Sequence, residues 1–148
     1  MCREYLAQLR ERISELEARG FQVIVIAPSK GTFINQFLEQ FGPFPFPILG
    51  DPSREAYRGM GHKTMPKWKL LSKAAFGFIT GKVKGFVPDN EKQKEFVMKS
   101  MKTQNVYIQG GTWLFSPQGK ILWKHIDESP ENHAKIADVL KKMDEVKA

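Results

Sequence analysis

The strongest nucleophile that this sequence offers is the thiol of Cys2, its only cysteine. Arg3 follows it, and then comes a stretch with apolar residues at helical spacing, so we expect Cys2 at a helix N-terminus. Unpaired backbone N–H groups and the dipole at such an end stabilise a thiolate, and Arg3 adds a positive charge. A thiolate there can attack a peroxide oxygen or a disulfide. The alternative is that a cysteine so close to Met1 is frayed and chemically idle.

The remaining residues that could carry chemistry form no metal-binding pattern. His62, His125 and His133 are widely scattered, and one cysteine cannot make a zinc motif, so we predict no metal and no other cofactor. A single cysteine also excludes an intrachain disulfide and fits a reducing cytoplasm. The charged N-terminus lacks a signal-peptide core, and no run approaches the roughly 20 apolar residues of a membrane-spanning helix. We therefore expect a soluble, cytoplasmic protein.

The net charge of +7 comes from one middle segment. Between His62 and Lys102 there are ten lysines and three acidic residues, while the rest of the chain is neutral. The segment contains no arginine, so we expect no nucleic-acid partner. Residues 67–86 mix lysine with Trp, Leu, Phe and Ile. We interpret them as a cap that packs its apolar side on the sheet and solvates its lysines. Contact with a membrane surface is the alternative.

The elements that must position Cys2 follow from periodicity and turn residues. Leu6, Leu9, Ile13 and Leu16 predict one amphipathic helix that ends at Gly20. The β-branched run at residues 21–27 predicts a strand buried on both faces of a parallel sheet. The next expected elements are a helix containing Phe33, Phe37 and Phe41, a short strand at 46–49, and a helix from Pro52 to about Met60 that is capped by Asp51. We then expect helices at 68–79 and 90–101, followed by a hairpin of 112–115 and 120–126 that is joined by Ser116-Pro117-Gln118-Gly119. A last helix from about Pro130 to Met143 should bury Ile136, Val139, Leu140 and Met143.

This order predicts a single α/β domain over residues 1–148, with a basic insert at about 62–105. A buried parallel strand, an antiparallel hairpin and a terminal helix indicate a mixed sheet with helices on both faces. In such a unit a strand normally leads into the first helix. The sequence has no room for that strand before Cys2, so we expect the first, central strand to be missing.

Several short motifs resemble one family when they are taken in order. They are Cys2-Arg3-Glu4-Tyr5-Leu6, Val23-Ile24-Val25-Ile26, Ile48-Leu49-Gly50-Asp51-Pro52 with Arg54 and Tyr57, Gln109-Gly110-Gly111-Thr112, and the stretch from Asp127 to His133. Together they resemble the thioredoxin superfamily and its alkyl hydroperoxide reductase/thiol-specific antioxidant branch. Within that branch the likeness is to the peroxiredoxin-like family related to prostamide/prostaglandin F synthase. It covers nearly the whole chain apart from about 62–105.

The resemblance implies a thioredoxin-like fold and a role for several residues. Cys2 is similar in position to the second cysteine of the family's Cys-x-x-Cys pair. The first cysteine, or a selenocysteine, and the central strand would then lie upstream of Met1, as in an N-terminally shortened chain. Gly110, Gly111 and Thr112 fall where many such proteins place a cis-proline loop at the active site. No proline stands there, which argues against thioredoxin-like substrate binding. A tight backbone turn is the alternative use of the two glycines.

The functional expectation is a thiol-dependent oxidoreductase that reduces peroxides or disulfides through Cys2. Arg3, Gly110, Gly111 and Thr112 would support the site or bind the substrate. A lone thiol needs an external thiol reductant, of the thioredoxin or glutathione type, to resolve its intermediate. Assembly into a homodimer is left open. The alternative is a non-catalytic thioredoxin-fold module that acts only as a binding domain.

Overall fold

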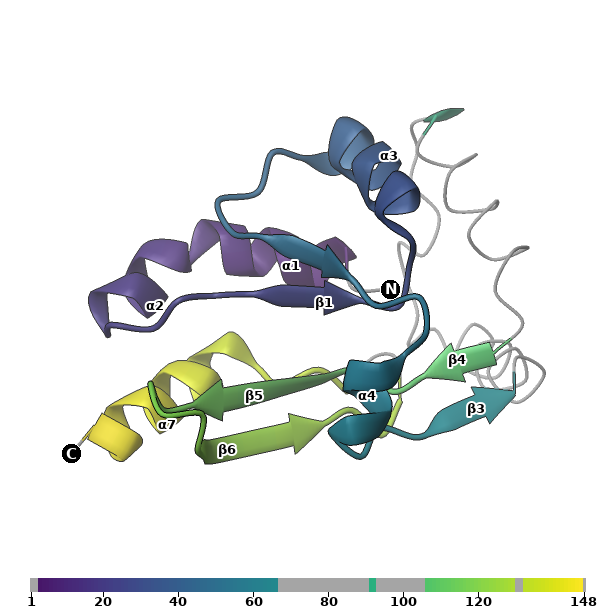
Figure 1. Ribbon diagram of the computed structural model, residues 1–148. Coiled ribbons are helices and arrows are strands. Elements are labelled where there is room, and N and C mark those ends of the chain that lie inside the picture. The colour runs from purple at the N-terminus through teal and green to yellow at the C-terminus, as the bar shows by residue number, and fades with distance from the viewer. Residues whose placement is uncertain (1–2, 67–90, 93–105, 130–131, 148) are drawn as a thin grey trace, which may run out of the picture.

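The computed structural model describes residues 3–66, 91–92, 106–129 and 132–147 (Figure 1). Cys2, the predicted helix at 68–79 and nearly all of the one at 90–101 lie outside these residues. The helices are α1 (Arg3–Glu11), α2 (Ile13–Ala18), α3 (Gly31–Phe41), α4 (Glu55–Gly59) and α7 (Ile136–Lys147), and the strands are β1 (Val25–Ala27), β2 (Ile48–Gly50), β3 (Thr64–Pro66), β4 (Val106–Ile108), β5 (Gly111–Phe115) and β6 (Ile121–Ile126).

The first helix is divided into α1 and α2, where the sequence predicted one continuous helix. The break falls at Arg12, whose backbone N–H contacts the carbonyls of both Gln8 and Leu9 at 3.2 Å, as in a tighter turn. The predicted apolar stripe survives the break, because Leu6 and Leu16 are both buried. Gly20 adopts a φ of +79° and ends the helical segment, as predicted.

The strands β1 and β2 pair in parallel, with Ile26 opposite Leu49. The prediction that this strand is buried on both faces is wrong. Alternate side chains of a strand point to opposite faces. Val23 packs against the core on one side, whereas Ile24, Ile26 and Leu49 on the other are 54%, 40% and 53% exposed. No described element covers that second face.

Two helices flank the end of β2. α3 lies beside β2 (Figure 1) and buries Ile34. The Asp51 carboxylate accepts hydrogen bonds from the N–H groups of Glu55, Ala56 and Tyr57 at 3.0–3.4 Å, so it caps α4 as predicted. The helix begins at Glu55 instead of Pro52, because Arg54 takes a left-handed conformation with a φ of +60°.

The predicted hairpin and the final helix pack together and bury apolar side chains between them. β5 and β6 pair antiparallel, and Gly119 closes their turn with a φ of +81°. α7 starts about six residues later than predicted and runs on to Lys147, yet it buries the predicted residues. Within the described residues, one cluster of buried side chains packs here: Leu16, Leu114, Ala134, Ile136, Val139, Leu140 and Met143.

In the part of the chain that the structure describes, the strands form three pieces of two strands each. The sequence missed the antiparallel pair of β3 and β4, in which Thr64 faces Ile108. Among the described residues β1–β2 and β5–β6 share no ladder, so the single mixed sheet that was predicted is not continuous. The mixture of helices with small parallel and antiparallel sheets is consistent with an α/β, thioredoxin-like fold.

Candidate functional site

Thr112, at the end of the predicted segment Gly110–Thr112, lies beside Tyr5 in the first turn of α1. The hydroxyl oxygen of Tyr5 is 3.5 Å from Oγ1 of Thr112, across 107 positions of sequence. One of the predicted site residues, Thr112, therefore lies beside the helix that follows Cys2 in the sequence. Cys2 itself is outside the residues that the structure describes.

Gly110 and Gly111 are glycines because buried side chains approach their backbone closely. A Cβ on Gly110 would lie 2.8 Å from Oδ2 of Asp127. A Cβ on Gly111 would lie 2.6 Å from Cε1 of His62 and 2.7 Å from the carbonyl oxygen of His125. Neither glycine has a positive φ or lies in a turn, and Gly111 already begins β5, so the alternative of a tight turn is wrong. The pair provides room for two polar residues under the loop.

His62 is one of those residues, and its two ring nitrogens are both satisfied. The side chain is buried, with Nδ1 2.7 Å from the carbonyl oxygen of Gln109. Trp113 donates its Nε1–H to Nε2 of His62 at 3.1 Å. A carbonyl can only accept, so Nδ1 carries the hydrogen and Nε2 accepts. This neutral imidazole joins the start of β3 to β5 and has no lone pair left to act as a base.

Asp127 is the second buried residue and is only 2% exposed. Its Oδ2 accepts a hydrogen bond from Nδ1 of His133 at 2.6 Å. Its Oδ1 is buried without a hydrogen-bond partner and lies 3.5 Å from Nε2 of His125. Sequence reasoning judged the histidines only as metal ligands and missed this pair. Asp127 and His133 flank the turn between β6 and α7, a local signal that could have revealed them.

The structure places Arg3 against α3. Its guanidinium lies 5.4 Å from the centre of the Phe41 ring. It lines a surface pocket of about 300 Å³ together with Arg10, Gln40 and Phe44, among others. The Arg3 guanidinium therefore makes a cation–π contact with the Phe41 ring.

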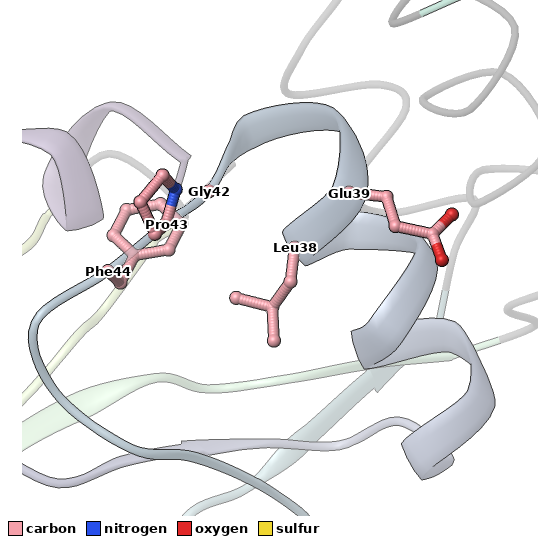
Figure 2. Close-up of a pocket in the computed structure, with 5 residues that line it drawn as sticks. All are labelled: Leu38, Glu39, Gly42, Pro43 and Phe44. Carbon is pink, nitrogen blue, oxygen red and sulfur yellow. The ribbon is translucent and has the colours of Figure 1, made fainter.

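A larger pocket of about 470 Å³ lies at the C-terminal end of α3 (Figure 2). Leu38, Gly42, Pro43 and Phe44 line it together with Glu39, whose carboxylate points away from the proline and phenylalanine rings in Figure 2. The lining holds no thiol or imidazole. The pocket is thus mainly apolar, whereas His62, His125 and His133 lie around Gly111 and Asp127.

Two classes of feature were not found in the described part of the chain. It contains no group of three or more His, Cys, Asp or Glu side chains arranged to hold a metal ion. None of the helices described there is long and apolar enough to cross a membrane.

The fold and the site thus define a thioredoxin-like α/β protein with polar residues buried under a glycine loop, Gly110–Gly111 at the start of β5. A family model described as "AhpC/TSA antioxidant enzyme" matches residues 8–129, which is most of the chain. The chain belongs to this peroxiredoxin-like family, which confirms the resemblance found in its motifs. The matched range begins after Cys2. No curated protein and no solved structure matches the chain.

Proposed function

We propose that this protein is a peroxiredoxin-like thiol oxidoreductase that reduces peroxides or disulfides through Cys2. One observation carries the proposal: in a member of this family, the contact between Tyr5 and Thr112 brings the first turn of α1 beside the glycine loop. Cys2 precedes that turn in the sequence. A helix N-terminus favours the thiolate, which is the reactive form of a cysteine.

The reaction begins with attack of the Cys2 thiolate on one oxygen of a hydroperoxide. The S–O bond forms as the O–O bond breaks, and the other oxygen leaves and takes up a proton as water or an alcohol. Cys2 becomes a sulfenic acid. An external thiol then condenses with it to a mixed disulfide and releases water. A second thiol frees Cys2 and completes the disulfide of the reductant. The reductant is external, because the chain holds no second cysteine.

The supporting residues take different parts in this proposal. Gly110 and Gly111 let buried polar groups approach the loop, and the Thr112 hydroxyl faces Tyr5. Arg3 carries a positive charge at the first residue of α1, with its guanidinium over the Phe41 ring.

The test compares the protein with its Cys2→Ser variant. Consumption of hydrogen peroxide and of an organic hydroperoxide is measured with an excess of reduced thioredoxin or glutathione. A serine hydroxyl without a base is not a nucleophile, so the variant should lose consumption and keep its circular dichroism spectrum. Full activity in Cys2→Ser would overturn the proposal. An inactive parent protein whose thiol titrates near the free value of about 8.5 would favour the non-catalytic binding module.

A further inference from the structure

The smaller pocket, between α1 and α3, carries two arginines on one side of α1. It has a volume of about 300 Å³, and the residues that line it include Arg3, Glu4, Ala7 and Arg10 of α1 together with Phe41 and Phe44. Arg3, Ala7 and Arg10 follow one another at spacings of four and three residues, so they lie along one face of the helix. The short alanine between the two arginines leaves room for a ligand.

Arg10 is held in place while part of its guanidinium stays available. Its Nη1 donates to the carbonyl oxygens of Phe41 and Pro43 at 3.3 and 3.2 Å. Its Cζ lies 5.0 Å from the centre of the Phe44 ring. Among the described residues, no acceptor takes a hydrogen bond from Nε or Nη2 of this exposed side chain. These two nitrogens form one edge of the guanidinium, which matches the two oxygens of a carboxylate.

Two other arginines of this protein show what that edge binds. Nε and Nη2 of Arg12 donate to the two carboxylate oxygens of Glu15 at 2.7 and 2.9 Å. The same nitrogens of Arg19 donate to the two oxygens of Asp144 at 2.9 and 3.2 Å. Arg10 has the same pair of donors and lines a pocket, yet no carboxylate of the described chain pairs with it. A ligand carboxylate would supply the missing acceptors.

The aromatic wall of the pocket is fixed by neighbouring rings. Phe44 stacks on Phe37 with an interplanar angle of 5° and a centroid distance of 5.9 Å. Phe37 in turn lies 5.0 Å from Phe41, and Phe44 lies 5.6 Å from the buried ring of Phe46. Groups that are already in place lose little freedom when a ligand binds. Phenyl rings and guanidinium planes are also the surfaces on which a flat ring packs well.

We propose that this pocket binds a small aromatic monocarboxylate, whose carboxylate pairs with Nε and Nη2 of Arg10 and whose ring packs against Phe41 and Phe44. The volume lies at the lower end for ligand pockets, which limits the ligand to one ring with a short side chain. Arg3 and Arg10 bring two positive charges and Glu4 one negative charge, so the lining favours a monoanion over a dianion. The proposal goes beyond the proposed function and involves no thiol chemistry.

A purely structural role for Arg10 makes a different prediction. Its two hydrogen bonds also join α1 to the carbonyls of Phe41 and Pro43, at the end of α3. If Arg10 only fastened these two segments, its replacement would lower stability. No carboxylate would then bind to the parent protein at this pocket.

The test measures binding of phenylacetate to the full chain by isothermal titration calorimetry, without peroxide or reductant. Phenylacetamide keeps the shape of this probe and lacks its charge, and phenylmalonate adds a second carboxylate. Arg10→Gln removes the donor pair, whereas Ala7→Leu fills the pocket and keeps both arginines. The matched control is Arg58→Gln, because Arg58 is also exposed and also donates to a backbone carbonyl, that of Ser53. Circular dichroism reports the fold of each variant.

We expect phenylacetate to bind with a dissociation constant of about 1 mM or lower, as suits a ligand of this size. Arg10→Gln should weaken binding by about tenfold or more, because hydrogen bonds between charged groups are lost. Ala7→Leu should weaken it to a similar extent by occupying the space. Arg58→Gln should stay within about twofold of the parent. Phenylacetamide should bind about tenfold more weakly than phenylacetate, and phenylmalonate should also bind more weakly.

Four results would overturn the proposal. They are no binding of phenylacetate at about 10 mM, equal binding of the acid and its amide, unchanged affinity in a folded Arg10→Gln protein, and equal losses in Arg10→Gln and Arg58→Gln. If Arg10→Gln does not fold, Ala7→Leu decides, since leucine is a good helix former at this half-buried position. Unchanged affinity in Ala7→Leu would overturn the proposal as well. Peroxide consumption is measured separately, so its failure leaves this result intact.

Discussion

In the β5–β6 hairpin Leu114 points into a core closed by α7 and is 4% exposed, whereas no residue of β1 or β2 is buried. Both pairs are short and rich in apolar residues. They differ in what covers them. α2 and α7 close one face of the hairpin, and the face of β1–β2 that carries Ile26 and Leu49 has no cover in the described chain. Burial is thus decided by neighbours that are distant in sequence.

The face of the hairpin that points away from the core also exposes apolar side chains. Phe115 and Ile121 are 43% and 51% exposed. Large exposed apolar side chains are unusual when they gather on one protein surface. The closed core of α7 and the hairpin should therefore carry most of the stability, and the exposed apolar residues little of it.

The largest effect should come from a matched pair of leucine truncations. Leu140→Ala empties a buried position in the closed core and should lower the free energy of unfolding by about 2–5 kcal/mol. Leu49→Ala removes a half-exposed side chain of β2 and should cost less than about 1 kcal/mol. Urea unfolding followed by circular dichroism measures both. Equal losses in the two variants would contradict the contrast between the closed and the open region.

An intermediate effect is expected from glycine replacements. In Gly111→Ala the new Cβ would meet the His62 ring and the His125 backbone, so we expect a loss of about 1–3 kcal/mol. Gly31→Ala at the start of α3 is the control, because nothing lies within 4 Å of its Cβ position. Thermal unfolding of both variants gives the comparison. A Gly111→Ala protein as stable as its parent would show that His62 does not press on this loop.

The smallest effect belongs to a surface ion pair of α2. The hydrogen bond from Arg12 lowers the pKa of Glu15 below its ordinary value. A carboxyl with a lowered pKa stabilises the fold above its unfolded pKa, and this contribution is lost as the pH falls through the folded value. Glu15→Gln should therefore destabilise slightly at neutral pH and not at all once the glutamate is protonated. Urea unfolding of both proteins, at neutral pH and in acid, measures the difference in the free energy of unfolding. A larger loss in acid would contradict it.

The sequence alone determined most of the local structure. The periodicity of Leu6 and Leu16, the turn at Gly119 and the cap by Asp51 depend on near neighbours, so they could be predicted. The family could also be recognised, since its motifs keep their order along the chain. The start of α4 was predicted too early, because the left-handed conformation of Arg54 has no clear signal in its neighbours.

Only the tertiary structure decided which distant residues meet. The bare face of β1–β2 depends on what packs above it, and the β3–β4 pair joins segments about 40 positions apart in register. For the same reason the sequence named Gly110 and Gly111 but not the side chains beneath them. His62 and Asp127 reach those glycines across 49 and 17 positions, through contacts that no local pattern encodes. Asp127 and His133 are only six positions apart, so their pairing is the part of this site that a local signal could have revealed.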